Sequence, residues 1–218
     1  MVPAQPQFSW VLIIVRIMDS NEPLASDSTN AQDAHLVILL GRMADGDENA
    51  LGQFYDATLG KVYGLALRIT GKPEAAEDVA AEVFHQAWRQ AEQYNADRGR
   101  PLAWLLTVTR SRALDSLRRR DEAESHPEPD TLAEPVEAED SNPQDLLLGV
   151  ERDGALHKAL ATLAPIQRQL LALAFYRDMS HQDIAEHLDM PLGTVKTHIR
   201  KALQKLQGLL SQAEEAVP

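Results

Sequence analysis

The chain has 218 residues, of which 44% are hydrophobic and 25% charged, a composition typical of globular proteins with one or two domains. Aromatic residues make up only 5%, while alanine, leucine and glutamate are plentiful, which favours helices over sheets. Because no cysteine occurs, disulfides, thiolate metal sites and cysteine nucleophiles are excluded. Nothing in the sequence points to secretion, and we expect a cytoplasmic protein.

The net charge of −12 is concentrated in one short segment. Residues 121–151 contain eleven acidic residues and no lysine or arginine, whereas residues 36–120 and 152–210 each carry a small excess of basic residues. The acidic balance of the whole chain therefore describes this segment and does not exclude nucleic-acid binding by the rest.

The beginning of the chain predicts an extension, residues 1–33. Its apolar stretch from Phe8 to Met18 is interrupted by Arg16 and is shorter than the roughly 20 residues that span a bilayer. It also lacks the basic start and cleavage site of a signal peptide. We expect no stable membrane insertion, but an interfacial anchor and a misplaced start, with translation beginning at Met18, both stay open. Residues 19–33 are polar and are expected to be disordered.

Residues 34–120 predict a bundle of four helices with short connections. Gly71-Lys72-Pro73 breaks the second helix, residues 95–101 form a loop, and the fourth helix covers residues 102–120 with a basic end. Apolar stripes mark the first three helices, namely Leu36, Leu39, Leu40 and Met43, then Phe54, Leu59, Val62, Leu65, Ala66 and Ile69, then Val79, Val83, Phe84, Ala87 and Trp88.

Residues 121–151 predict a flexible linker, because four prolines stand among its acids and few large apolar residues precede Leu146. Apolar periodicity resumes after it, so that residues 152–210 form a second helical domain. The predicted fold class is therefore all-α, with an N-terminal helical bundle and a C-terminal helix-turn-helix domain joined by an acidic flexible linker.

The strongest local signal lies in residues 180–206. Ser180 can cap a first helix with Asp183 as its capping-box partner, and Pro191 and Gly193 are expected to set the turn that follows. The second helix has an inward stripe of Val195, Ile199, Ala202 or Leu203, and Leu206. Its outward residues are Lys196, Thr197, Arg200, Lys201, Gln204 and Lys205. Such a helix fits the DNA major groove, and the combination favours DNA binding over an ordinary helix pair with a solvated basic face.

These motifs resemble the extracytoplasmic-function (ECF) subfamily of bacterial RNA polymerase sigma factors. Residues 163–171 and 180–201 look like the family's C-terminal domain, whose second helix reads the −35 promoter element. Residues 76–89 resemble the helix that docks on the polymerase clamp, and residues 101–120 resemble the helix that melts and reads the −10 element. The resemblance covers roughly residues 36–120 and 152–208 in the family's order.

The resemblance implies three sets of binding residues. The −35 set is Lys196, Thr197, His198, Arg200, Lys201 and Lys205. The −10 set is Arg98, Trp104, Thr107, Arg110, Ser111, Arg112, Arg118, Arg119 and Arg120. The polymerase set is Asp78, Glu82, Phe84 and Trp88, in which both aromatic residues, like Trp104, also suit a core position. Ser111 and Ala81 depart from the family, where an asparagine and a glutamine are frequent.

The resemblance also implies the partners: core RNA polymerase, through the clamp of β′ and the flap of β, promoter DNA, and an anti-sigma factor. A role in a stress or envelope response is expected, with no catalysis, no cofactor and no metal. Three alternatives compete with this interpretation: an enzyme, a stand-alone regulator, and a pure interaction module, which the family's usual retention by an anti-sigma protein suggests. A di-iron enzyme is disfavoured because Glu82-x-x-His85 occurs only once. A stand-alone helix-turn-helix regulator explains residues 152–208 but not residues 74–120.

Overall fold

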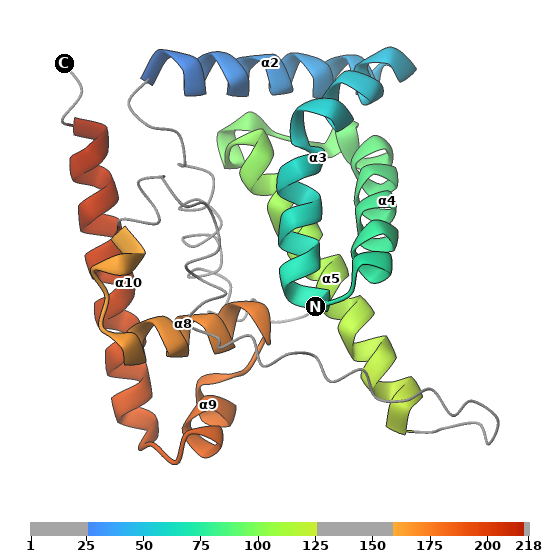
Figure 1. Cartoon of the computed structure of the whole chain (residues 1–218). Coiled ribbons are helices and arrows are strands. Elements are labelled where there is room, and N and C mark those ends of the chain that lie inside the picture. The colour runs from blue at the N-terminus through green and yellow to red at the C-terminus, as the bar shows by residue number, and fades with distance from the viewer. Residues whose placement is uncertain (1–25, 126–158, 216–218) are drawn as a thin grey trace, which may run out of the picture. The chain divides into compact units, whose positions relative to one another are not determined.

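The computed structural model describes residues 26–125 and 159–215 (Figure 1). Every regular element within these residues is helical, which confirms the all-α prediction. Most of α2–α5 forms one compact unit, and α8–α10 belong to another. The elements are α2 (Ser26–Ala44), α3 (Glu48–Thr70), α4 (Pro73–Gln90), the short 3₁₀ turns η1 (Ala91–Gln93) and η2 (Ala96–Arg98), α5 (Pro101–Ser125), α8 (Pro165–Tyr176), α9 (His181–His187) and α10 (Leu192–Glu215).

Helix α2 begins at Ser26, earlier than the sequence pattern predicted, and this corrects the expectation that residues 26–33 are disordered. An ion pair between Asp33 and Arg100 ties this early part of the helix to the loop before α5. The predicted stripe is confirmed, since its four side chains are buried, namely Leu36, Leu39, Leu40 and Met43. The expectations for residues 1–25 lie outside the described residues.

Helix α3 is bounded by caps that the sequence specifies. The Asp47 side chain accepts hydrogen bonds from the backbone N–H groups of Asn49 and Ala50, at 2.9 and 3.3 Å, and so begins the helix. Gly71 ends it in the left-handed conformation, with φ of 72°, where glycine meets no steric penalty. Pro73 then starts α4 at a position that needs no N–H donor.

The interior of the first unit is formed largely by α3 packing against α4. The Phe54 and Phe84 rings meet edge to face with centroids 6.4 Å apart. The predicted stripe of α3 is confirmed except at Leu59, which is half-buried, while its neighbour Thr58 is buried instead. The Thr58 hydroxyl can occupy this apolar site because it donates a hydrogen bond to the Phe54 carbonyl at 2.7 Å.

Helix α5 continues past its predicted end at Arg120 as far as Ser125. The sequence of residues 121–125 allows this, since alanine and glutamate are good helix formers and the first proline downstream is Pro127. Beyond Ser125, the predicted linker lies outside the described residues.

In the second unit, α10 packs on both α8 and α9. Residues 170–176 of α8 are all buried, so this helix is covered on every side over two turns. No helix within residues 26–125 or 159–215 combines the length and apolar character that crossing a bilayer requires.

Candidate nucleic-acid and polymerase interfaces

Helix α9 begins at Ser180 through a reciprocal capping box, as the sequence predicted. The Ser180 hydroxyl accepts from the Asp183 N–H at 3.1 Å, and the Asp183 carboxylate accepts from the Ser180 N–H at 2.8 Å. The backbone N–H of Ser180, and secondarily its side chain, stabilise the ionised carboxylate and so lower the pKa of Asp183. The carboxylate is therefore ionised at neutral pH and fixes the point at which the helix-turn-helix begins.

The turn between α9 and α10 is made at Asp189. The expectation that Gly193 sets this turn was therefore wrong. Asp189 has φ of 49°, in the left-handed region, whereas Gly193 lies within the first turn of α10. The N–H groups of Asp189 and Met190 bond to the carbonyls of Glu186 and Ala185, at 3.3 and 2.8 Å. This is the Schellman pattern, with aspartate in the place that glycine most often takes. Aspartate tolerates this conformation better than most residues do.

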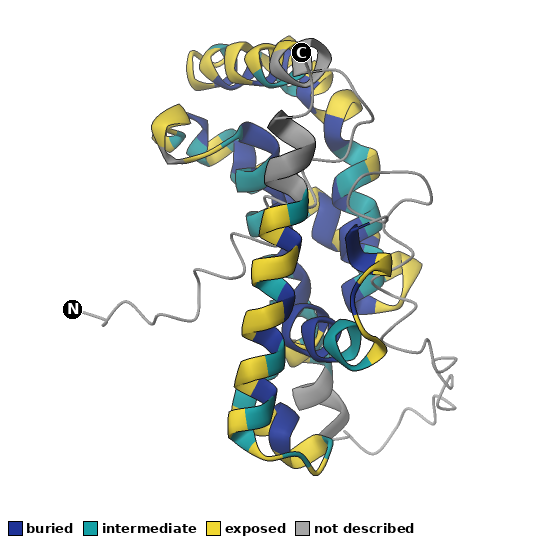
Figure 2. Cartoon of the chain, turned by 90° about the vertical axis from the view of Figure 1, so that its left-hand side faces the viewer, coloured by how far each residue is buried: buried dark blue, intermediate teal, exposed yellow. Residues whose placement is uncertain are grey.

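Helix α10 has a buried face and an exposed one, which Figure 2 shows as dark blue and yellow residues along the same helix. Its buried stripe is the predicted one, Val195, Ile199, Ala202 and Leu206, each at most 3% exposed. The opposite face exposes Lys196, Thr197, Arg200, Lys201, Gln204 and Lys205, while His198 is half-buried. The buried stripe anchors the helix on α8 and α9, so the exposed residues are presented on a rigid support.

Two residues of this face make hydrogen bonds within their own unit, and a third residue, His181, lies near the charge of Lys196. The Thr197 hydroxyl donates to the Gly193 carbonyl at 2.7 Å and keeps its lone pairs available as acceptors. The Lys205 ammonium donates to the Thr162 carbonyl, which places it away from the early turns of α10. Burial, and secondarily the positive charge of Lys196, lower the pKa of His181 on α9. Both effects favour the neutral form of His181.

The arginines of α5 fall into different environments, although the sequence assigned them one role. Arg118 and Arg119 are exposed and Arg112 is half-exposed, as a phosphate-binding surface requires. Arg110 is only 6% exposed, because it falls on the buried face of α5 with Leu106 and Ala113. Its position argues against the predicted contact with the DNA backbone.

Arg120 also serves its own fold. Its guanidinium donates to the Thr70 carbonyl at 3.2 Å and so satisfies the C-terminal end of α3. The other members of the −10 set differ in exposure: Ser111 is exposed and Thr107 is half-buried. Trp104 is half-buried with its ring centroid 5.6 Å from that of Tyr94. The side chain of Arg98 lies outside the described part of the structure.

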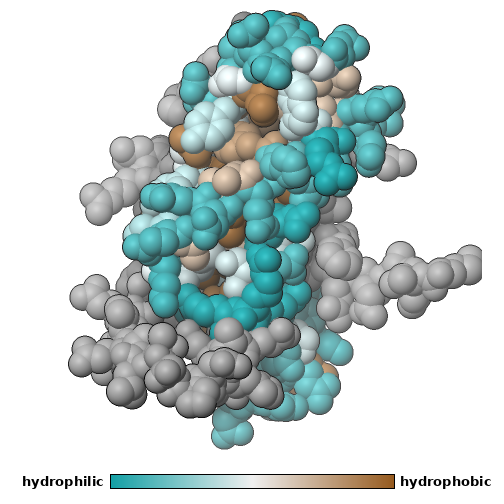
Figure 3. All heavy atoms as spheres, turned by 90° about the vertical axis from the view of Figure 1, so that its right-hand side faces the viewer, coloured by the Kyte–Doolittle hydropathy of each residue, from teal (hydrophilic) through white to brown (hydrophobic). Residues whose placement is uncertain are grey.

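The polymerase set on α4 is also divided by burial. Asp78 is exposed and Trp88 half-buried, so both can reach a partner. Phe84 is 5% exposed and packs against Phe54 and Tyr55, with a centroid distance of 4.6 Å to Tyr55. It holds α4 on α3 rather than presenting a surface. On the side of the molecule drawn in Figure 3, hydrophilic side chains predominate and hydrophobic ones are visible between them.

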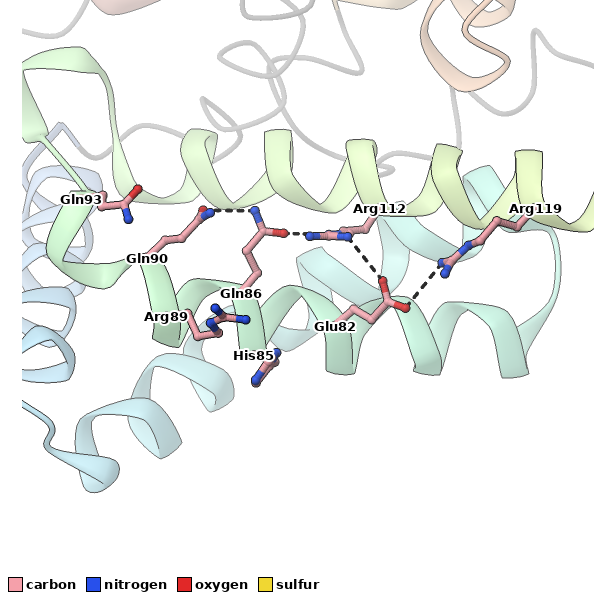
Figure 4. A pocket seen from close by; sticks show the side chains of 8 residues that line it. All are labelled: Glu82, His85, Gln86, Arg89, Gln90, Gln93, Arg112 and Arg119. Carbon is pink, nitrogen blue, oxygen red and sulfur yellow. Dashed lines mark hydrogen bonds and ion pairs between the residues drawn. The ribbon is translucent and has the colours of Figure 1, made fainter.

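A groove of about 400 Å³ runs between α4 and α5 and brings the two predicted sets together (Figure 4). Glu82 of the polymerase set pairs with two arginines of the −10 set, at 4.0 Å from Arg112 and 3.5 Å from Arg119. The groove is lined by Glu82, His85, Gln86, Arg89, Gln90, Gln93, Arg112 and Arg119. Three of these residues are arginines and one is a carboxylate, so the groove is basic.

Sequence reasoning missed Gln86, which accepts a hydrogen bond from Arg112 Nε at 2.7 Å. A signal was present, because Glu82, Gln86 and Gln90 recur every four residues and form one polar row on α4. The Glu82-x-x-His85 pair is not arranged for metal binding, since the Glu82 carboxylate faces two arginines. Among the described residues, no group of three metal-ligating side chains comes together.

Comparisons with known proteins match both units. Residues 54–123 match the family Sigma-70 region 2, and residues 153–206 match Sigma-70, region 4. The chain is 34% identical to a protein named ECF RNA polymerase sigma factor SigK from Mycobacterium ulcerans (strain Agy99), over 86% of this chain and 96% of that protein. It is 31% identical to the protein of the same name from Mycobacterium bovis (strain BCG / Pasteur 1173P2), over 79% of this chain and 91% of that one.

Among solved structures, the chain is similar to Rhodobacter sphaeroides SigE, crystallised in complex with the anti-sigma ChrR. The identity is 27%, the TM-score is 0.42, and the match covers 81% of this chain and 98% of that one. The two family matches together cover more than half of the chain, in the order region 2 then region 4. On these matches and the identity to the SigK proteins, the chain belongs to the ECF family of RNA polymerase sigma factors, which bind core RNA polymerase and direct promoter recognition.

Proposed function

We propose that this sigma factor divides its contacts among three helices: α10 reads the −35 element, α5 binds the −10 element, and α4 docks on the clamp of β′. The observation that supports this most directly is the division of α10 into a buried apolar stripe and an exposed basic face. A helix held in this way can enter the major groove with its early residues against base edges and its later ones against phosphates.

The proposed contact residues are chosen by exposure within each set, leaving out Lys205, which donates to the Thr162 carbonyl, and Glu82, which pairs with Arg112 and Arg119. On α10 they are Lys196, Thr197, Arg200 and Lys201, with His198 at the margin. On α5 they are Ser111, Arg112, Arg118 and Arg119, with Thr107 and Trp104 partly accessible. On α4 they are Asp78 and Trp88. Arg110, Arg120 and Phe84 support the fold that presents them.

The domain boundaries are proposed with both limits of the first unit moved, because α2 begins at Ser26 and α5 ends at Ser125. Residues 26–125 act as the unit that binds polymerase and the −10 element, and residues 152–210 act as the unit that binds the −35 element and the flap of β. The acidic segment between them connects the two. A stand-alone helix-turn-helix regulator would leave residues 54–123 without a role, although they match Sigma-70 region 2.

We further propose that the protein works in the cytoplasm, where polymerase and the chromosome are, and that it catalyses no reaction itself. Regulation by an anti-sigma factor in a stress or envelope response is proposed from family membership. Addition of such a partner to the purified chain should prevent its association with core polymerase in gel filtration. A partner that binds while leaving this association intact would contradict the proposal.

Run-off transcription tests the main proposal. Core polymerase is assayed on promoters from the same genome, with and without this chain, and with a variant in which Arg200 and Lys201 are both replaced by glutamine. We expect no transcript without the chain, transcript with the unmodified chain, and strongly reduced transcript with the variant. Lys72→Gln, which removes an exposed charge outside the proposed interfaces, is the matched control. No transcript, together with tight duplex binding by the chain alone, would favour the stand-alone regulator.

A further inference from the structure

The polar row of Glu82, Gln86 and Gln90 on α4 faces the arginines of α5 (Figure 4). Gln86 lies at the centre of this row. Its amide nitrogen donates to the Gln90 side-chain oxygen at 3.1 Å, and its own oxygen accepts from Arg112 Nε at 2.7 Å. Because Gln90 fixes the orientation of the Gln86 amide, the Gln86 oxygen is directed at Arg112.

Glu82 holds the same arginines in a looser way. One carboxylate oxygen lies 3.5 Å from Arg119 Nη2 and the other lies 4.0 Å from Arg112 Nη1. The Glu82 side chain is 41% exposed, and those of Arg112 and Arg119 are 41% and 62% exposed. Long, solvated ion pairs of this kind are weak and exchange readily with other anions. Gln86 thus makes the short contact to Arg112, and Glu82 makes the replaceable ones.

We infer that Glu82 is an internal counter-ion that occupies Arg112 and Arg119 in place of DNA phosphates, and that Gln86 is the positioning residue for Arg112. The inference rests on the proposed role of α5 in DNA binding. A guanidinium binds carboxylate and phosphate oxygens with the same donor geometry, so the two anions compete for it. A phosphate that reaches this groove must displace Glu82, which lowers the net affinity for DNA.

This role differs from the polymerase contact that the resemblance implies for Glu82. Glu77 offers a matched comparison, because it is an exposed glutamate on the same helix and does not line the groove. Glu82→Gln and Glu77→Gln remove the same charge from α4, but only the first removes the anion beside the arginines. Gln86→Glu is the opposite change, since it adds a carboxylate where Arg112 Nε already has a short contact.

The experiment measures binding of a labelled single-stranded oligonucleotide carrying the −10 sequence to the full-length chain, over a series of salt concentrations. Relative to Glu77→Gln, we expect Glu82→Gln to bind about threefold to tenfold more tightly at low salt. Its plot of log affinity against log salt should steepen by up to about 1.4, the value for two additional phosphate contacts on a single strand. Gln86→Glu should bind more weakly than the unmodified chain. A merely structural role for the row would not shift affinity in opposite directions.

Replacing Arg112 and Arg119 together by glutamine separates the two possible failures. If this double variant loses DNA affinity while Glu82→Gln equals Glu77→Gln, the counter-ion role is wrong and the proposed role of α5 stands. If the double variant binds DNA as well as the unmodified chain, both are wrong. Thermal unfolding of each variant confirms that the comparison is made between folded proteins.

Discussion

Ser180 and Asp183 decide where α9 begins, and their hydrogen bonds make this start sensitive to pH. The folded-state pKa of Asp183 is lowered by the backbone N–H and the hydroxyl of Ser180. Ionised Asp183 therefore favours the folded state at every pH above its ordinary pKa of about 3.9, and this contribution is lost as the pH falls through the lower, folded value.

Removing the Ser180 cap tests this arrangement. We expect Ser180→Ala to lower the free energy of unfolding of the α8–α10 unit by about 1 kcal/mol at pH 7, because an N–H donor at the start of α9 loses its acceptor. Asp183→Ala should also destabilise at pH 7, but its effect should shrink as the pH falls toward 2–3. Urea unfolding at pH 7 and at pH 2–3 measures these differences in the free energy of unfolding. An Asp183→Ala effect that is equal at the two pH values would count against an ionised cap.

The pKa of His181 depends on its surroundings, which include Lys196 in the first turns of α10. Burial and the Lys196 charge both lower its pKa, with burial the larger cause. Stability linked to this histidine is complete above its ordinary pKa of about 6.5 and decreases as the pH falls from there toward the folded value. We expect an NMR titration to give a pKa below 6.5 for His181, and Lys196→Gln to raise it only in part. A full return to the ordinary value in that variant would show that charge, and not burial, is the main cause.

At the scale of the element, the two faces of α10 make different contributions. Ile199 is 3% exposed, and its replacement by alanine leaves a cavity beneath the helix. We expect Ile199→Ala to cost about 2–4 kcal/mol in unfolding free energy. Arg200 is its exposed neighbour. Arg200→Ala should change stability by less than about 0.5 kcal/mol but weaken duplex binding and reduce the salt slope by about 0.9 if it contacts one phosphate.

Two measurements on both variants of the full chain distinguish a loss of stability from a loss of DNA affinity. They are denaturant unfolding and duplex binding over a series of salt concentrations. Gln207→Ala, at an exposed position further along the same helix, serves as the control for the loss of an outward side chain. An equal loss of stability in Ile199→Ala and Arg200→Ala would mean that the predicted apolar stripe of α10 does not pack against the rest of its unit.

The helices that the sequence predicted correctly are those whose apolar spacing alone specifies the buried face. The stripe Val195, Ile199 and Leu206 is an example, because a period of 3.6 residues leaves only one face to bury. The turn before it was predicted less well. Pro191 and Gly193 look like turn residues, but the left-handed residue is Asp189, whose short polar side chain makes this conformation tolerable.

The arginines of α5 show what helical periodicity leaves undetermined. One run of basic residues contains Arg110, which is buried, Arg112, which is bound by Gln86 of α4, and Arg120, which caps the end of α3. The environment of each arginine depends on contacts with other helices. The residues in contact are far apart in the sequence: Gln86 and Arg112 are separated by 26 positions, and Thr70 and Arg120 by 50. A pattern read along a single helix carries no information on them.

At the scale of the whole molecule, the charge distribution predicts self-inhibition of DNA binding. Nearly all of the net charge of −12 comes from residues 121–151, while the units on either side carry the basic surfaces proposed to bind DNA. An acidic segment attached to a basic surface is present at high effective concentration and competes with DNA phosphates. A test by substitution should leave residues 121–125 unchanged, because they belong to α5 and their replacement would also affect that helix.

The acids of residues 126–151 are therefore the ones to neutralise. We expect replacement of these eight residues by their amides to strengthen binding of the free chain to duplex DNA at low salt. The gain should diminish above about 0.15 M salt, where the Debye length falls to about 8 Å and the segment and the basic surfaces no longer attract one another over longer distances. Unchanged binding at low salt would mean that these acids do not shield the basic helices. A gain that persists undiminished at high salt would point to a direct contact, because long-range attraction is screened under those conditions.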